Sequence, residues 1–217
     1  MTVELRTTRL RPAQYREMQW RNGGGSTTEI AIEPAGAGLQ AGPPFLWRLS
    51  MARVHQDGPF SRFAGYDRTL VLLEGRGVRL DFGAAAPPVT LAGPLSAAAF
   101  AGEWATHCQL LDGPVRDFNL MVDRQRGAAR VEVFALVAQG RAEVQLRGHT
   151  GLLFVAQGAV AAHLGDAPAG EPVAKLETER FERDAAEAPI PVALFATDGP
   201  AQLLWIDIEL RRSGLAG

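Results

Sequence analysis

Short apolar runs separated by glycine and proline dominate the chain. In residues 77–82 and 141–146, apolar and polar residues alternate with the period of two expected of strands that bury one face. Further short β-like runs, more continuously apolar, lie at residues 45–54, 69–73, 118–122, 131–137, 152–156 and 203–210. Many short strands at regular spacing are typical of a sandwich or a barrel. The pattern therefore predicts an all-β fold.

Helix signals are scarce. Residues 10–19, with Pro12 in the first turn, predict one short helix, and the polar segment 176–187 predicts another. The longest uncharged stretch, residues 83–102, contains three prolines and consists mostly of alanine and glycine. We interpret it as a loop with short strands, because a membrane-spanning helix needs about 20 predominantly apolar residues.

Two unrelated motifs recur along the chain at nearly the same spacing. The run LVLLEG ending at Gly75 matches LFVAQG ending at Gly158, an offset of 83 residues. Asp-Gly-Pro at 112–114 recurs at 198–200, an offset of 86, each time followed by an apolar run. We predict two copies of one β unit, joined near residues 123–130. A third Asp-Gly-Pro, at 57–59, keeps open the alternative that this tripeptide is merely a common turn.

Composition narrows the class of protein. The chain has a net charge of −2 and a pI near 6.1, which argues against a general nucleic-acid or membrane-surface binder. Of its 22 basic residues only Lys175 is lysine, so the chain is rich in guanidinium groups that bind carboxylates with two hydrogen bonds. One cysteine excludes an internal disulfide framework. The first ten residues lack the apolar core of a signal peptide, so a cytoplasmic protein is expected.

The densest cluster of candidate functional residues is WRNGGGSTTE at 20–29. Three consecutive glycines let the backbone approach a ligand and present N–H groups to an anion, with Arg21 supplying charge. The alternative is a flexible hairpin turn with a solvated arginine. The sequence leaves both interpretations open.

Polar residues also alternate inside two strongly apolar runs. Arg48 and Ser50 share one face of a predicted strand, and Asp117 and Asn119 share one face of another. Either these faces point to solvent, or they point into a small barrel where a few polar groups orient a ligand. Periodicity does not decide which face is inside. At Asp67-Arg68 the alternatives are a local ion pair, or an arginine that faces a pocket and is held by Asp67.

Metal-binding and nucleophilic motifs are weak. The four histidines lie far apart, with no His-x-His or His-x-x-x-His pair. His107 and Cys108 are adjacent and would point to opposite faces of an extended chain, which is a poor nucleophile and base pair. We therefore expect Cys108 to be structural, and we predict no catalytic residue and no metal ligand.

Four segments, 20–29, 47–75, 100–103 and 110–122, together resemble the HutD/Ves family of cupin-like proteins. The resemblance implies a bicupin, with two small double-stranded β-helix (jelly-roll) barrels formed by the internal repeat. Residues 1–125 would form the barrel with the family signature, and residues 126–217 a degenerate second barrel. Ala64 replaces a proline expected in the family pattern, which affects only the local turn.

The family signature also implies which residues bind a ligand. These are Trp20, Arg21, Asn22, Gly23, Gly24, Gly25, Glu29, Arg48, Ser50, Ser61, Asp67, Arg68, Glu103, Asp117 and Asn119. The signature further includes Asp57, Gly58, Pro59, Phe60, Asp112 and Met121. Metal-dependent cupins carry a His-x-His pair, whereas residues 60–68 and 117–119 contain no histidine. The resemblance therefore implies a protein without a metal or another cofactor.

Three functions follow as hypotheses. The first is a metal-independent binding or regulatory protein for a small acidic metabolite, with N-formylglutamate as one candidate, because the resemblance implies a link to histidine utilisation. The second is an isomerase or hydrolase of carboxylated substrates, with Glu29, Glu103 and Asp117 as acids and bases. The third is a scaffold whose signature stabilises the fold. No nucleic-acid or membrane partner is expected, and a homodimer is left open as the assembly.

Overall fold

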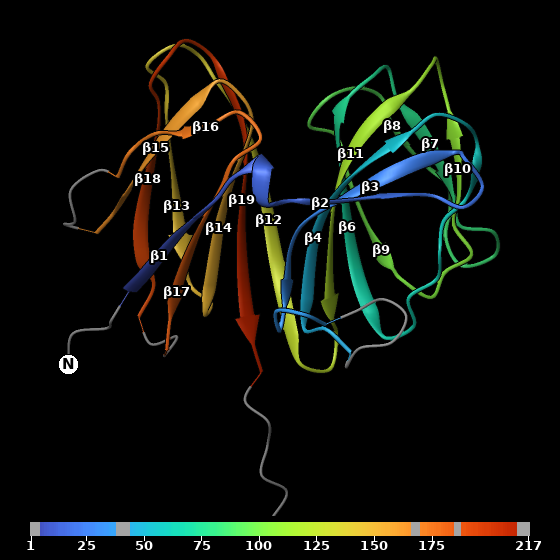
Figure 1. The fold of residues 1–217 in the computed structure, drawn as a ribbon, viewed down its shortest axis with the longest axis horizontal. Helices are drawn as coiled ribbons and strands as arrows, with labels where there is room; N and C mark the ends of the chain where they lie inside the picture. The colour runs from blue at the N-terminus through green and yellow to red at the C-terminus, as the bar shows by residue number, and fades with distance from the viewer. Residues whose placement is uncertain (1–4, 38–43, 166–169, 185–187, 212–217) are drawn as a thin grey trace, which may run out of the picture. The chain divides into compact units, whose positions relative to one another are not determined.

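The computed structural model describes residues 5–37, 44–165, 170–184 and 188–211. Within these residues the chain forms strands β1 to β19 and one short 3-10 helix, η1 (Pro12–Gln14) (Figure 1). The prediction of an all-β fold is confirmed. None of the described residues belongs to a helix long and apolar enough to cross a membrane.

The described residues divide into two compact units. The central unit comprises residues 15–126, and the terminal unit combines the residues up to Gln14 with those from Gly127 onward. This differs from the expected division into 1–125 and 126–217, because β1 (Leu5–Leu10) pairs antiparallel with β17 (Thr178–Arg183). An ion pair of 3.0 Å between Arg9 and Glu179 links the same two strands. A local sequence pattern does not show such a distant partner.

The central unit contains two sheets. The six-stranded sheet has the order β2 (Arg16–Gln19), β3 (Gly25–Glu33), β4 (Trp47–Val54), β11 (Val115–Asp123), β6 (Tyr66–Glu74) and β9 (Ala97–Ala101). The four-stranded sheet has the order β5 (Gly58–Pro59), β10 (His107–Leu110), β7 (Val78–Asp81) and β8 (Val89–Leu91). Because β8 and β9 are the short strands of residues 83–102, the prediction for that stretch is confirmed.

The terminal unit also contains two sheets. The five-stranded sheet has the order β1, β17, β14 (Thr150–Gln157), β19 (Ala201–Leu210) and β12 (Gly127–Leu136). The four-stranded sheet has the order β13 (Arg141–Leu146), β18 (Ile190–Ala196), β15 (Ala159–Leu164) and β16 (Val173–Ala174).

The strand orders of the two units correspond. The order β4-β11-β6-β9 is repeated as β12-β19-β14-β17, and β5-β10-β7-β8 is repeated as β13-β18-β15-β16. The recurring sequence motifs meet at the same place in each unit. Gly75 has φ +104°, and a Cβ there would lie 2.9 Å from the Pro114 carbonyl oxygen. Gly158 has φ +79°, and a Cβ there would lie 2.5 Å from the Pro200 carbonyl oxygen. Only glycine fits both sites, which explains why the two motifs recur together.

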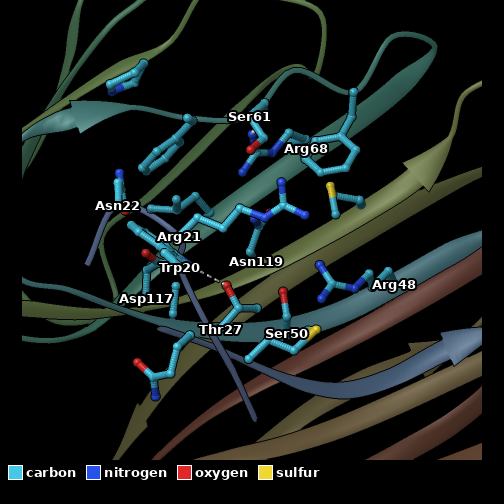
Figure 2. Close-up of a pocket in the computed structure, with 18 residues that line it drawn as sticks. Trp20, Arg21, Asn22, Thr27, Arg48, Ser50, Ser61, Arg68, Asp117 and Asn119 are labelled. Carbon is cyan, nitrogen blue, oxygen red and sulfur yellow. Dashed lines mark hydrogen bonds between the residues drawn. The ribbon is translucent and has the colours of Figure 1, made fainter. Parts of the chain in front are cut away.

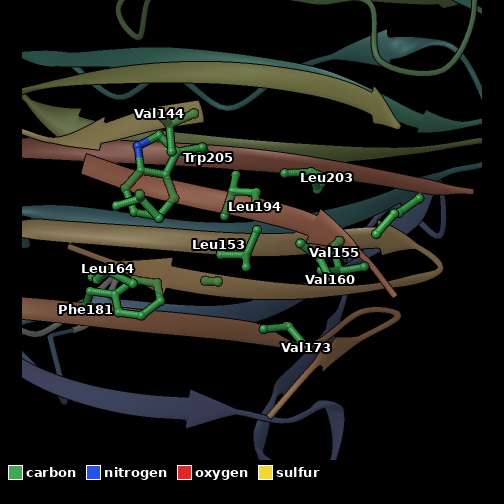
Figure 3. Packing of buried hydrophobic residues seen from close by; sticks show 14 of the residues in the cluster. Val144, Leu153, Val155, Val160, Leu164, Val173, Phe181, Leu194, Leu203 and Trp205 are labelled. Atoms are coloured by element: carbon green, nitrogen blue, oxygen red, sulfur yellow. The ribbon is translucent and has the colours of Figure 1, made fainter. Parts of the chain in front are cut away.

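Apolar side chains fill the space between the sheets of each unit. In the central unit, Leu70 and Leu72 of β6 pack with Leu80 of β7 and with Cys108, which is 1% exposed. In the terminal unit, Leu153, Leu203 and Trp205 belong to the corresponding cluster (Figure 3). Burial of this kind is the main stabilising contribution to such a fold.

The helix predicted within residues 10–19 is confirmed only as the three-residue 3-10 helix η1, and the helix predicted at 176–187 was wrong. Residues 10–19 form η1 and then β2, whose residues pair with β3 from Arg16 opposite Glu29 to Gln19 opposite Ser26. Residues 176–187 contain β17, in which Thr178 and Glu179 are buried, while residues 185–187 lie outside the described residues. In both places pairing with a neighbouring strand outweighs a weak local helix propensity.

Candidate functional site

The candidate site lies on the three adjacent strands β4, β11 and β6 of the central unit. Met121 on β11 is opposite both Arg48 on β4 and Arg68 on β6. Asn119, two residues earlier, is opposite Ser50 on β4. Because alternate residues of a strand share a face, these side chains project from the same side of the sheet. The two arginines therefore flank Met121, with Ser50 and Asn119 in the next row.

A pocket of about 550 Å³ lies over this face (Figure 2). Its walls come from β4, β6 and β11, from β2 and β3 with the turn between them, and from β5 with the segment after it. The lining residues are Met18, Gln19, Trp20, Arg21, Asn22, Thr27, Arg48, Ser50, Ala52, Pro59, Phe60, Ser61, Phe63, Arg68, Leu70, Asp117, Asn119 and Met121. The structure thus places the alternating polar faces of β4 and β11 toward a pocket.

The pocket brings together part of the set of ligand-binding residues predicted from the sequence. The residues in its walls are Trp20, Arg21, Asn22, Arg48, Ser50, Ser61, Arg68, Asp117 and Asn119. The residues outside its walls are Gly23, Gly24, Gly25, Glu29, Asp67 and Glu103. Each of the second group has another role in the structure.

Arg48 is a buried cation with one free hydrogen-bond donor. Its Nε donates to Oε2 of Glu29 at 2.7 Å, so Glu29 neutralises and orients the guanidinium from outside the pocket wall. Nη2 of Arg48 is buried and has no hydrogen-bond partner. Since an unsatisfied buried donor costs about 1–3 kcal/mol, this nitrogen favours an added acceptor.

Arg68 is a second buried cation and is enclosed by aromatic rings. Its guanidinium carbon lies 5.4 Å from the ring centre of Phe60, 5.7 Å from that of Phe63 and 4.9 Å from that of Phe100. Nη1 donates to the Ser61 carbonyl oxygen at 3.3 Å, whereas the buried Nε has no partner. Burial lowers the pKa of Arg68 to about 10, so the side chain remains a cation at neutral pH.

Asp117 and Asn119 add a carboxyl group and an amide to the same face. Burial raises the pKa of Asp117 to about 7, and the nearby Arg68 only partly opposes this effect. Oδ1 of Asn119 is buried without a hydrogen-bond partner. Two unpaired donors and one unpaired acceptor thus belong to residues of a single pocket.

The glycine-rich turn shapes one wall of the pocket. Gly23 N–H donates to the Trp20 carbonyl oxygen at 3.0 Å, and Gly24 N–H donates to Oδ1 of Asn22 at 3.0 Å. These N–H groups are used inside the turn, which is why the structure shows no anion-binding nest formed by them. Trp20 is fixed in turn by its indole Nε1, which donates to Oγ1 of Thr27 at 2.8 Å.

Asp67 and Glu103 lie in an exposed ion-pair network. Nε of Arg124 is 2.7 Å from Oδ1 of Asp67, and Nη1 of Arg124 is 2.8 Å from Oε1 of Glu103. The Arg124 guanidinium holds the pKa of Glu103 below its usual range. Asp67 and Arg68 are consecutive on β6 and so point to opposite faces. Asp67 therefore does not hold Arg68 in the pocket.

Half of the lining residues are not among the residues predicted to bind a ligand. Those omitted are Met18, Gln19, Thr27, Ala52, Pro59, Phe60, Phe63, Leu70 and Met121. A signal existed for Ala52, Leu70 and Met121, because each lies two residues from a predicted site residue on the same strand. Met18 and Gln19 carried no such signal, since the sequence suggested a helix there.

Metal ligands and a reactive thiol are not features of this pocket. The described part of the chain contains no group of three or more histidine, cysteine, aspartate or glutamate side chains arranged to hold a metal ion. Cys108 lies in the core, where burial raises the pKa of its thiol to about 12. A thiol of this kind is not ionised at neutral pH and is a weak nucleophile.

The buried carboxyl of Asp117 predicts a pH-dependent stability. Its pKa is raised from 3.8 to about 7 in the folded protein, so between these values the folded state binds more protons than the unfolded state. The contribution of Asp117 to the free energy of unfolding is therefore expected to fall as pH rises from about 4 to about 7. Urea titrations across this range measure the effect, with Asp117→Asn expected to flatten it. An equal slope in the variant would contradict the assignment to Asp117.

The strand arrangement and the pocket define an all-β protein of cupin-like fold. A cupin 2 conserved barrel domain protein from Leptotrichia buccalis has a TM-score of 0.50 at 10% identity, covering 89% of this chain and 96% of its own. At that identity the likeness shows the fold alone. The family model described as HutD matches residues 12–198. The chain belongs to the HutD family, as the sequence resemblance indicated.

Three relatives agree with this assignment. An uncharacterised 21.2 kDa protein of the hutC 3′ region of Pseudomonas putida is 40% identical over 168 residues, which are 77% of this chain and 80% of that protein. A conserved protein of unknown function from Pseudomonas aeruginosa is 35% identical with a TM-score of 0.80, covering 96% and 100% of the two chains. HutD from Pseudomonas fluorescens is 30% identical with a TM-score of 0.76, covering 95% and 100%. The family is thus linked to the histidine-utilisation gene region.

Proposed function

We propose that the pocket of the central unit binds a small acidic metabolite without a metal ion. We further propose that this binding gives the protein a regulatory role linked to histidine utilisation. The observation that carries the proposal is the pair of buried arginines, Arg48 and Arg68, each with an unpaired nitrogen in a residue that lines the pocket. Charge-assisted bonds to a carboxylate would satisfy these donors and fix the orientation of the ligand. Arg21, exposed in the pocket wall, adds a third positive charge.

The unpaired acceptor narrows the chemical class of the ligand further. Oδ1 of Asn119 needs a hydrogen-bond donor, and a carboxylate has none. An amide N–H close to a carboxylate satisfies both requirements, as in an N-acylated amino acid. N-formylglutamate has this chemistry, and the location of one relative in a hutC region supports a link to histidine utilisation.

The finer description of the fold is part of the proposal. We propose that each unit is a small double-stranded β-helix barrel, so that the chain is a bicupin. The repeated strand order and the repeated glycine contacts support a duplicated unit.

One observation favours an enzyme as the second candidate. Asp117 is buried in the pocket with a pKa near 7, which suits a general acid or base at neutral pH. The other proposed carboxylates lie elsewhere, because Glu29 pairs with Arg48 and Glu103 with Arg124. Turnover of N-formylglutamate that is lost in Asp117→Asn would support an isomerase or hydrolase.

Ligand binding is tested by thermal shift and calorimetry with N-formylglutamate, glutamate and glutarate. A ligand at about 100 times its Kd should stabilise the protein by roughly 2.7 kcal/mol. We expect the largest shift with N-formylglutamate, and Arg68→Met is expected to remove it. Arg76→Met is the matched control, because Arg76 is an exposed partner of Asp112 and does not line the pocket. No shift with any of the three acids would contradict the proposal.

A further inference from the structure

The terminal unit has positions that correspond to the polar residues of the pocket. On β14 and β19, Leu153 is opposite Trp205, just as Leu70 is opposite Asn119 on β6 and β11. Leu70 and Leu153 are themselves equivalent in the sequence repeat, with the offset of 83 residues seen at the glycines. Trp205 therefore occupies the position of Asn119.

The same register identifies two further equivalents. Gly151 is opposite Asp207 on β19, as Arg68 is opposite Met121, so Gly151 takes the position of Arg68. Leu203 is two residues before Trp205, as Asp117 is two residues before Asn119. Three positions that are polar in the pocket are thus tryptophan, glycine and leucine in the terminal unit.

Trp205 lies over Gly151 and fills the space of a missing side chain. A Cβ at Gly151 would lie only 2.8 Å from Cη2 and 3.1 Å from Cζ2 of the indole, and 3.0 Å from Cδ1 of Leu146. The indole is fully buried, its Nε1 donates to the Gln145 carbonyl oxygen at 3.3 Å, and its ring centre lies 5.9 Å from that of Phe181. Figure 3 shows it within the packed apolar cluster beside Val144.

We infer that Trp205 and Gly151 form a plug that closes, in the terminal unit, the place that is a ligand pocket in the central unit. The fold accepts an apolar filling at this place, so the sheets do not require the polar groups of Arg68, Asp117 and Asn119. This distinguishes a ligand site from a purely structural network. With the terminal unit closed, each chain is expected to bind one ligand. This consequence rests on the proposed function, whereas the plug itself does not.

The plug is tested by the coupling between its two residues. Gly151→Ala should lower the Tm of the wild-type protein, because the new methyl group meets the indole. In a Trp205→Leu background the same change should lower the Tm less, since both contacts with the indole are gone and only the contact with the end of the Leu146 side chain remains. Gly170→Ala is the control, because the atom nearest to its Cβ is 3.9 Å away. An equal loss from Gly151→Ala in both backgrounds would overturn the inference.

A cavity test complements the coupling. Trp205→Ala is expected to leave an apolar cavity, and added indole should raise the Tm of this variant but not of the wild type. If Trp205→Ala does not fold, the Gly151 comparison decides the question alone. The expectation of one ligand per chain is tested by calorimetry with N-formylglutamate, which should give one site per chain. Two sites would overturn the plug, whereas no binding combined with coupled Tm effects would refute only the proposed function.

Discussion

Replacing Arg48 with methionine is expected to reduce affinity for the acidic ligand at least about 100-fold, because a charged, desolvated donor is lost. The same change leaves the Glu29 carboxylate largely buried without its partner at 2.7 Å. Loss of one member of a buried ion pair typically costs about 3–5 kcal/mol, so the free energy of unfolding should fall strongly as well. Calorimetry and urea unfolding measure the two effects separately.

A second variant separates the two effects of Arg48. The double variant Arg48→Met with Glu29→Gln removes both charges of the pair and should recover most of the lost stability. It should still fail to bind the ligand. Recovery of binding in the double variant would show that Arg48 acts only by neutralising Glu29 and does not contact the ligand.

Gly25→Ala is expected to cause the largest change in stability among the glycine variants of the β2–β3 turn. A Cβ at Gly25 would lie 2.1 Å from the Arg53 carbonyl oxygen on β4, and 3.1 Å from two ring carbons of Trp20. Backbone atoms cannot give way as a side chain can, so we expect a loss of about 3 kcal/mol. Displacement of Trp20 should also weaken ligand binding.

The adjacent residue supplies the control for this variant. At Gly24 a Cβ would meet Nε2 of Gln56 at 2.8 Å, which is the end of a flexible side chain that can move aside. Gly24→Ala should therefore cost less than about 1 kcal/mol. Urea unfolding measures the free energy of unfolding of both variants. Equal losses would show that the contact with β4 is not what makes alanine unfavourable at Gly25.

The sequence predicted the strands and the pairs of residues that share a face, but not the direction of each face. β4 illustrates the reason, since its residues from Trp47 to Met51 are all buried. An inner strand of a sheet that is covered on both sides has no solvent face, so alternation of polar and apolar residues does not reveal where the pocket lies. Arg48 was therefore equally compatible with a surface and a ligand site.

Two other parts of the site depended on long-range geometry. Glu29 reaches Arg48 across a register shift between Glu29 and Ala31 on β3, and a bulge of this kind leaves no signature in the sequence. Asp67 was grouped with Arg68 because the two are adjacent, whereas its partner is Arg124, 57 residues away. Distance along the chain was a poor guide to contact in both cases.

The pairing of β1 with β17 has a consequence for the order in which the chain folds during synthesis. Residues 15–126 form a continuous unit that can complete its sheets as soon as it leaves the ribosome. Leu5–Leu10 is made before the central unit, whereas its partner, Thr178–Arg183, is made only after the whole of that unit. β1 therefore cannot pair with β17 until the whole central unit has been synthesised, and its edge must stay unpaired until then.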